Sequence, residues 1–179
     1  MNENIENTAA EPSLSEVLQI RRDKLSALVA AGRDPFEKVR FDFDAYTKDI
    51  KDNFDEMEGK TVRIAGRMMS RRDMGKANFI DIMDASGRIQ CYVRINDIGE
   101  ETFDEYRKWD IGDIVGIRGE VFRTQKGEIS VKAHEIVLLS KSLLPLPEKW
   151  HGLKDTELRY RQRYVDLIVS PEVKETFVK

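Results

Sequence analysis

The stretch Ser70-Arg71-Arg72-Asp73-Met74-Gly75-Lys76-Ala77-Asn78-Phe79-Ile80-Asp81-Ile82-Met83-Asp84 contains a turn and a strand whose two faces differ in chemistry. Two arginines lead into a glycine-containing turn, after which Ile80 and Ile82 alternate with Phe79 and Asp81. A period of two places neighbouring side chains on opposite faces of a strand. Phe79 is therefore predicted to face away from the core, close to cationic side chains. An aromatic ring beside arginines on a sheet is typical of surfaces that bind unpaired bases.

The same alternation continues on both sides of this stretch and predicts five strands. Three strands, a short helix and two strands within about 80 residues are typical of a five-stranded OB-fold Greek-key barrel, in a mainly β protein with flanking helices. A single open antiparallel sheet is the alternative, but the long first strand, with a bend or bulge expected at Gly66, favours closure. The predicted elements are strands beginning at Thr61 and at about 77, a strand over 88–95, a helix around 100–109, and strands from Gly112 to Arg123 and from Ile129 to Leu139.

Helical patterns flank the barrel. Ser13 and Glu16 have the spacing of a capping box, and an apolar stripe that includes Arg21 follows until Gly32. Residues 42–57 predict an acidic, weakly helical connector. Further helices are predicted over 154–168 and from Ser170-Pro171-Glu172 onward, where a cap residue precedes proline.

These patterns divide the chain into four parts. Residues 1–12 are predicted to be a disordered tail, and residues 13–58 to form the N-terminal helix and its connector. Residues 59–142 are predicted to form the barrel. Residues 143–179 begin with a stiff Leu144-Pro145-Leu146-Pro147 segment and end in a helix that has only just begun. We therefore expect this chain to be a fragment that continues into a further domain.

Composition excludes several classes of protein. In 179 residues, 35% of them charged, no apolar run approaches the roughly 18 residues that a membrane span needs. The N-terminus lacks the order of a signal peptide. The single cysteine, Cys91, excludes an internal disulfide, is predicted to be buried, and favours a cytoplasmic protein. His134 and His151 are isolated, and no nucleophile motif, phosphate loop or metal-ligand spacing is present. We expect no catalytic residue, metal or cofactor in this chain.

Charge is unevenly distributed along the sequence. The net charge is −3, which argues against indiscriminate nucleic-acid binding. Residues 1–59 contain 8 basic and 14 acidic residues, whereas residues 60–94 contain 8 basic and 3 acidic residues. A locally basic sheet on an acidic protein suits selective binding of one short segment. Ordinary solvated strand charges are the alternative.

Four side chains are predicted to meet on the binding face of such a barrel, which lies on strands 1 to 3 between the loops 1–2 and 4–5. Phe79 could stack on a base, and Arg72 could donate to carbonyl oxygens or phosphate. Gln90 offers a donor and an acceptor to a pyrimidine edge, and Glu128 could accept from an imino N–H. Tyr92 lies beside them on strand 3.

Each of these residues also has a structural interpretation. Phe79 could belong to the core of a strand that is covered on both faces. Gln90 could be an ordinary solvated strand residue, and Glu128 a turn residue. Arg72 could form a surface ion pair with Asp73 or Asp81.

Several segments resemble the anticodon-binding region of bacterial-type class II lysyl-tRNA synthetases, from about residue 13 onward. The run that joins barrel to catalytic domain in that family is the most specific of them. The segments are Gly66–Arg72, Met74–Ala77, Gly87–Gln90 with Tyr92, Lys108–Asp113, Leu144–Leu153 and Glu157–Ile168.

This resemblance implies an assignment for individual residues. Phe79 matches the aromatic residue that stacks on the central anticodon uridine, Arg72 and Gln90 match side chains that hydrogen-bond that base, and Glu128 matches an acidic residue near the first anticodon position. The full-length enzyme would be a homodimer that charges tRNA(Lys) with lysine, using ATP and Mg²⁺ in a domain beyond this chain. Contacts to the tRNA backbone are expected from Arg71, Lys76, Arg21, Arg22 and Lys24.

Two other functions compete with anticodon reading. The first is a stand-alone OB-fold protein that binds single-stranded nucleic acid without sequence preference. The second is a protein-interaction module, in which the helical stripe rather than Phe79 would carry the function. Packing of the N-terminal helix on the barrel is likewise the alternative to its contact with tRNA.

Overall fold

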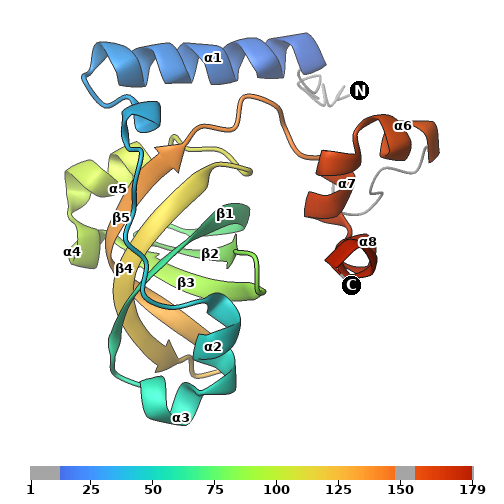
Figure 1. The fold of residues 1–179 in the computed structure, drawn as a ribbon. Helices are drawn as coiled ribbons and strands as arrows, with labels where there is room; N and C mark the ends of the chain where they lie inside the picture. The colour runs from blue at the N-terminus through green and yellow to red at the C-terminus, as the bar shows by residue number, and fades with distance from the viewer. Residues whose placement is uncertain (1–12, 148–155, 179) are drawn as a thin grey trace, which may run out of the picture.

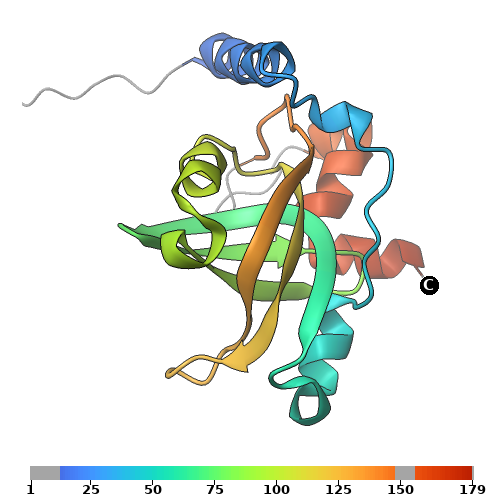
Figure 2. The same cartoon turned by 90° about the vertical axis from the view of Figure 1, so that its left-hand side faces the viewer.

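The computed structural model describes residues 13–147 and 156–178, and its centre is a closed five-stranded barrel (Figures 1 and 2). The strands follow one another in the order β1-β2-β3-β5-β4, and β4 pairs with β1. The predicted OB-fold barrel is confirmed, with two short helices in place of one between the third and fourth strands. The elements are β1 (Thr61–Met74), β2 (Ala77–Met83), β3 (Arg88–Arg94), α4 (Ile95–Ile98), α5 (Glu100–Tyr106), β4 (Ile114–Arg123) and β5 (Ile129–Ser140).

Strand β1 closes the barrel because it pairs with two neighbours along its length. Its first half, from Thr61 to Arg67, is antiparallel to β4, and its second half, from Arg67 to Met74, is antiparallel to β2. A parallel ladder between β3 and β5 completes the ring. One face of every strand is thereby buried, and the interior is filled by fully buried side chains, among them Ile64, Met68, Ile80, Ile82, Cys91, Val93, Ile117 and Val131.

The irregularity expected at Gly66 lies further along β1, at Met69. The register of β1 against β2 shifts between Met68 and Ser70, so Met69 is an extra residue in the strand. Met68 and Met69 are both buried, although strict alternation would place one of them outside. Gly66 remains in the ladder, opposite Val115. A Cβ at Gly66 would lie 2.6 Å from the Met83 carbonyl oxygen, so glycine permits the close approach of β1 and β2.

Helix α1 lies across one end of the barrel, and the short helices α2 and α3 lie at the other end (Figure 1). The predicted capping box is confirmed: Ser13 Oγ accepts from the Glu16 N–H, and Glu16 Oε2 accepts from the Ser13 N–H. The apolar stripe of α1 is less buried than its pattern suggests, with Leu14 65% and Val29 48% exposed, whereas Arg21 is buried. These helices are α1 (Leu14–Ala30), the 3₁₀ turn η1 (Pro35–Glu37), α2 (Thr47–Asp52) and α3 (Phe54–Met57).

Asp84, after β2, fixes α2 on the barrel. Its carboxylate accepts hydrogen bonds from the backbone and hydroxyl groups of Thr47, at 2.7 and 2.9 Å, and from Ser86 and the Gly87 N–H. Burial alone would raise the pKa of Asp84, but these hydrogen bonds together outweigh it and hold the pKa below its ordinary value. The ionised carboxylate therefore stabilises the first turn of α2.

The C-terminal helices lie beside the barrel (Figure 1): α6 (Thr156–Arg161), α7 (Arg163–Val169) and α8 (Pro171–Val178). The helical segment expected over 154–168 is interrupted at Gln162, and its first two residues lie outside the described ranges. The disordered tail expected over residues 1–12 also lies outside them. In the described parts of the chain, no helix is long and apolar enough to cross a membrane.

Candidate nucleic-acid interface

A groove of about 780 Å³ lies on the outside of the barrel, between the β1–β2 and β4–β5 hairpins. Figure 2 shows both hairpins projecting from the same side of the molecule. The predicted residues Arg72, Phe79, Gln90 and Glu128 all line this groove, although they come from three strands and a loop. The groove is completed by Met74, Asp81, Tyr92, Phe122, Thr124, Gln125 and Lys126.

Strand register aligns an arginine with two aromatic rings. Arg72 on β1 is opposite Phe79 on β2, which is opposite Tyr92 on β3. The guanidinium carbon of Arg72 lies 5.8 Å from the centroid of the Phe79 ring, and the Phe79 and Tyr92 rings are stacked at 4.8 Å and 28°. Phe122 extends this line, with its ring centroid 6.4 Å from that of Tyr92. Half-buried rings of this kind offer flat surfaces to a base.

A polar row lies next to the aromatic one. Ser70, Asp81 and Gln90 are register neighbours on β1, β2 and β3, and Ser70 Oγ donates a hydrogen bond to the Asp81 carboxylate. Gln90 is half-buried, and none of the described residues hydrogen-bonds its side-chain amide. The donor and the acceptor of this amide thus remain available to a ligand in the groove.

Arg72 does not form either of the ion pairs considered as its structural alternative. Within the described ranges, the ion pair of Asp73 is with Arg71, at 3.7 Å, and Asp81 is bonded by Ser70. The Arg72 side chain is exposed and lies over the Phe79 ring. Its guanidinium is therefore free to donate to carbonyl or phosphate oxygens.

Glu128 is held in the β4–β5 hairpin. Its N–H donates to Thr124 Oγ1 at 3.0 Å, its carbonyl accepts from the Thr124 N–H at 2.9 Å, and Gly127 has a positive φ of 86° that closes the turn. The carboxylate lies 3.4 Å from the ammonium of Lys51 on α2. Glu128 thus presents an exposed acceptor at one side of the groove.

The expected backbone contacts fall into two groups. Arg71 Nη1 donates to the carbonyls of Arg107 and Trp109, at 3.1 and 3.0 Å, and is not among the groove residues. Lys76 is exposed in the turn between β1 and β2, and Arg22 is exposed on α1. Adjacent arginines on β1 therefore have different surroundings: Arg71 supports the turn after α5, and Arg72 faces the groove.

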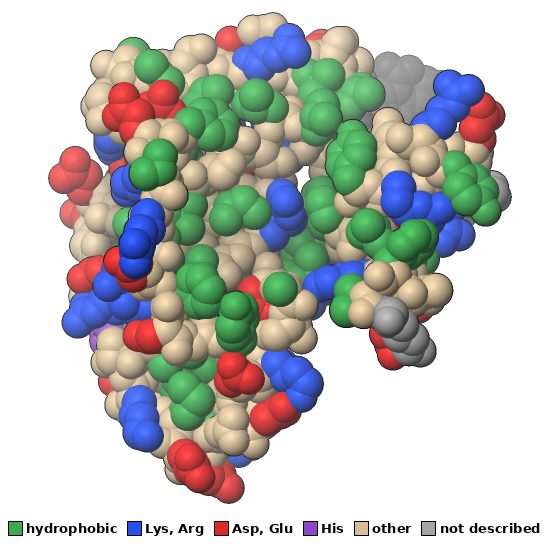
Figure 3. Space-filling model, in the orientation of Figure 1, with side chains coloured by type: hydrophobic (Ala, Val, Ile, Leu, Met, Phe, Trp, Pro, Cys, Tyr) green, Lys and Arg blue, Asp and Glu red, His purple; other side chains and the backbone are tan. Residues whose placement is uncertain are grey.

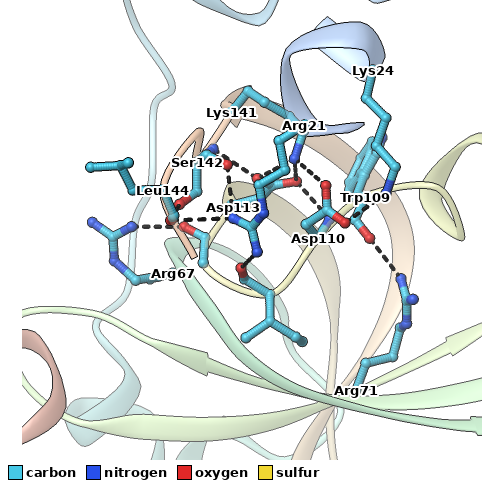
Figure 4. Close-up of polar contacts among 12 residues, drawn as sticks. Arg21, Lys24, Arg67, Arg71, Trp109, Asp110, Asp113, Lys141, Ser142 and Leu144 are labelled. Carbon is cyan, nitrogen blue, oxygen red and sulfur yellow. Dashed lines mark hydrogen bonds and ion pairs between the residues drawn. The ribbon is translucent and has the colours of Figure 1, made fainter. Parts of the chain in front are cut away.

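Arg21 and Lys24 attach α1 to the barrel (Figure 4). The Arg21 guanidinium donates to the carbonyls of Ser142, Leu144 and Ile111 at 2.8–3.3 Å. Lys24 Nζ lies 2.6 Å from the Asp110 carboxylate. Both cations bond to groups of the barrel, as the packing alternative for α1 expects.

These two side chains belong to a larger charged group, the Lys141 cluster, which consists of Arg21, Lys24, Asp110, Asp113 and Lys141. The buried Lys141 ammonium lies 2.6 Å from Asp110 and 2.8 Å from Asp113, and Asp113 also accepts from the N–H groups of Asp110 and Ser142. Burial alone would raise the pKa of Asp110, but hydrogen bonds from Lys141 and Lys24 outweigh it and keep the pKa below its ordinary value. In the sequence, the only sign of this cluster is that Asp110 and Asp113 precede β4 and Lys141 directly follows β5.

Several groove residues were not named by the sequence analysis, and the aromatic Phe122 and the cationic Lys126 are the two best suited to contact RNA. Phe122 follows the fully buried Val121, so its outward orientation could have been read from the alternation on β4. Lys126 is exposed at the tip of the β4–β5 hairpin, where strand alternation does not apply. On the face seen in Figure 3, acidic and basic side chains are interspersed, in keeping with the small net charge.

Comparisons with known proteins agree with the OB-fold barrel. Residues 62–139 match the tRNA anti-codon family, described as an OB-fold nucleic acid binding domain. The chain is 59% identical to a lysine–tRNA ligase of Syntrophomonas wolfei, over 95% of the chain and 34% of that protein. Identity to a lysine–tRNA ligase of Pelotomaculum thermopropionicum is 56% over 97% of the chain, and to one of Clostridium perfringens 52% over 99%. The chain spans about a third of the length of these relatives.

Proposed function

We propose that this barrel reads the anticodon of tRNA(Lys), because residues 62–139 match the model of an OB-fold nucleic acid binding domain and the chain around them is similar to lysine–tRNA ligases. The observation that carries the proposal is the groove. It brings Arg72, Phe79, Gln90 and Glu128, which are distant in the sequence, to one open surface between two hairpins.

In this proposal the central anticodon uridine stacks on Phe79. Truncation of a ring that stacks on one base typically costs about 1–3 kcal/mol. Tyr92 lies against the Phe79 ring at 4.8 Å and supports it. Arg72 donates to a carbonyl oxygen of the uridine, and the Gln90 amide pairs with its edge as both donor and acceptor. Glu128 accepts the imino N–H of the first anticodon base.

The anticodon backbone is proposed to run past exposed cations. Lys76 and Lys126 are on the two hairpins that flank the groove, and Arg22 is exposed on α1. Phosphate contacts of this kind strengthen binding of every sequence and make it dependent on salt. Arg71, Arg21 and Lys24 are weaker candidates for phosphate contacts, because their hydrogen bonds within the protein would have to be replaced.

For the whole protein we propose a lysine–tRNA ligase that joins lysine to tRNA(Lys) in the cytoplasm and acts as a homodimer. The support is the identity of 52–59% to lysine–tRNA ligases along nearly the whole chain. ATP and Mg²⁺ would be used by a catalytic domain beyond residue 179. The part represented here would contribute recognition and no catalytic residue.

The test is a titration of the 179-residue chain with an RNA stem-loop carrying the anticodon UUU, and with a variant of its central base, at fixed salt. We expect a preference for UUU. Arg72→Ala should reduce that preference, since it removes a donor to the central base. A uniform loss across sequences would instead identify Arg72 as a phosphate contact.

A stand-alone single-strand binder gives a different result in the same titration. Aromatic rings stack on every base, so such a protein would bind RNA and DNA loops of any sequence alike. Equal affinity for all the loops would overturn the proposal of anticodon reading and favour this alternative.

A further inference from the structure

The connector helices touch the hairpin that carries Glu128. Figure 1 shows α2 and α3 at the end of the barrel where β4 finishes. The Lys51 ammonium on α2 lies 3.4 Å from Glu128 Oε1, and the Arg123 guanidinium carbon at the end of β4 lies 4.3 Å from the centroid of the Phe54 ring on α3. These two contacts therefore link helices α2 and α3 to both sides of the β4–β5 hairpin, whose loop lines the groove.

The helical side of these contacts is firmly placed. Ile50 and Phe54 are buried in the barrel core, and Thr47 and Lys48 at the start of α2 are hydrogen-bonded by Asp84 and Ser86. Phe54 and Ile50 are close in sequence to Lys51, so the backbone that carries its side chain is anchored on both sides. A side chain that orients a ligand-binding group works best from such an anchored element.

The hairpin side is exposed and needs support. Gln125, Lys126, Gly127 and Glu128 are all exposed. Exposed loop tips with few packed contacts belong to the least stable parts of a fold. Lys51 bonds the Oε1 atom of Glu128, and none of the described residues hydrogen-bonds Oε2. Oε1 is therefore held by Lys51, and Oε2 is left to accept a hydrogen bond from a donor in the groove.

Building on the proposed function, we propose that Lys51 is a positioning residue for recognition of the first anticodon base. Its ammonium holds the Glu128 carboxylate so that Oε2 faces a base that donates an imino N–H, as uridine does. Lys51 itself does not touch the RNA. The specificity of the groove then depends on a residue outside the barrel, in the connector that precedes it.

The experiment compares two stem-loops that differ at one atom group. One carries UUU, and the other carries N3-methyluridine at the first position, which replaces the imino N–H by a methyl group. Wild type, Lys51→Met, Glu128→Gln and the double variant are titrated with both loops at several salt concentrations. Circular dichroism and thermal unfolding verify that each variant is folded.

We expect wild type to prefer UUU over the methylated loop. Lys51→Met should reduce that preference about three- to fivefold, the size expected for one partly exposed ion pair, by weakening UUU binding alone. Glu128→Gln should reduce it further, and Lys51→Met should have no additional effect in the Glu128→Gln background. Non-additivity of this kind identifies two residues that act through one interaction.

A matched control is available on the same helix. Lys48 on α2 forms an exposed ion pair with Asp52 and is not among the groove residues. Lys48→Met removes the same charge from the same helix, and should leave the preference between the two loops unchanged.

Three results would overturn the inference. Equal weakening of both loops, with a salt slope reduced by about one, would make Lys51 a phosphate contact. An unchanged preference in Lys51→Met would show that Glu128 needs no positioning. Wild type with no preference at the first base, but still selective at the central base, would remove the role of Glu128 and leave anticodon reading by Phe79 intact. If wild type lacked this preference and also failed to distinguish the central-base variant, the proposed function itself would be overturned.

Discussion

The Lys141 cluster and the groove both contain charged side chains, but those of the cluster have hydrogen-bond and ion-pair partners within the protein, whereas several polar groups of the groove have none among the described residues. In the cluster, Lys141 is almost inaccessible and lies within 2.8 Å of both Asp110 and Asp113, and Arg21 donates to three carbonyls. In the groove, the guanidinium of the exposed Arg72 lies over a ring, and among the described residues neither it nor the Gln90 amide has a hydrogen-bond partner.

This difference separates architecture from recognition. Polar groups that are buried need partners inside the protein, because an unpaired buried charge is strongly destabilising. Polar groups that read a ligand must keep their hydrogen-bonding capacity open until the ligand arrives. A basic or acidic residue in the sequence is therefore informative about binding only when the fold leaves part of its hydrogen-bonding capacity open.

The largest effect is expected when the cluster loses its central cation. Lys141→Met should lower the free energy of unfolding by about 3–5 kcal/mol, because it leaves two carboxylates close together without their buried partner. Urea unfolding measures the loss. Lys132 is on the same strand but half-exposed, 3.8 Å from Asp97, so Lys132→Met should cost about 1 kcal/mol or less. Equal losses in the two variants would remove the distinction between buried and exposed pairs.

In contrast to Lys141→Met, Phe79→Ala should affect RNA binding more than folding stability. The ring lies outside the barrel against Tyr92, so we expect only about 1 kcal/mol of lost folding stability. Binding of the UUU stem-loop should weaken by about 1–3 kcal/mol, since the stacking surface is lost. Calorimetric titration and urea unfolding give the two quantities.

Phe36→Ala, at an exposed ring that is not among the groove residues, is the control for Phe79→Ala and should leave RNA binding unchanged. A loss of stability of about 3–5 kcal/mol in Phe79→Ala would show that the ring is a core residue.

Asp84 accepts several hydrogen bonds within the protein but is partly exposed, so its substitution should have an intermediate, pH-dependent effect on folding stability. The pKa of Asp84 is lowered from 3.8 in the folded protein, so its contribution is present above about pH 4 and is lost as the pH falls through the folded value. Asp84→Asn should therefore lower stability by about 1–2 kcal/mol at pH 7, and by less at pH 3. Urea unfolding at both pH values measures this, and an effect that grows at acidic pH would contradict it. Asp55→Asn, at an exposed site on α3, is the control.

The smallest effect is expected at the edge of the cluster. Lys24→Met breaks a pair with Asp110 in which both partners reach solvent, so we expect at most about 1 kcal/mol of lost stability. Arg22→Met, at the exposed neighbour on α1, should not change stability. If Lys24→Met instead weakened RNA binding and reduced the salt dependence of the affinity, Lys24 would be a phosphate contact and would belong to the interface as well as to the cluster.

Much of the groove was predictable because the relevant pattern is local. Phe79 and Gln90 are on regular strands without bulges, so alternation with the buried Ile80 and Cys91 fixed the face to which each belongs. The bulge was expected at Gly66 and lies at Met69, because a bulge is one extra residue and alternation carries no sign of it. Phe122 was overlooked although its strand obeys the rule.

The roles of the arginines depended on tertiary contacts. Arg71 and Arg72 are adjacent and chemically identical, yet one supports the turn after α5 and the other lies over Phe79. Arg21 appeared on an apolar stripe, where a surface contact with RNA and a packing role looked equally reasonable. Its three carbonyl acceptors come from residues 111, 142 and 144, which are about 90 to 120 positions away.

By itself, the sequence determined the strands, the capped helix, the buried faces of β2 and β3 and the fold class, because periodicity, caps and turn residues act over a few neighbouring positions. Only the tertiary structure decided which charges are satisfied and which remain open. Closure of the barrel brings β1 against two partners, Lys141 between two aspartates, and Lys51 against Glu128. Those contacts join positions far apart in the chain, and a charged side chain is used for structure or for recognition according to the partners that closure brings to it.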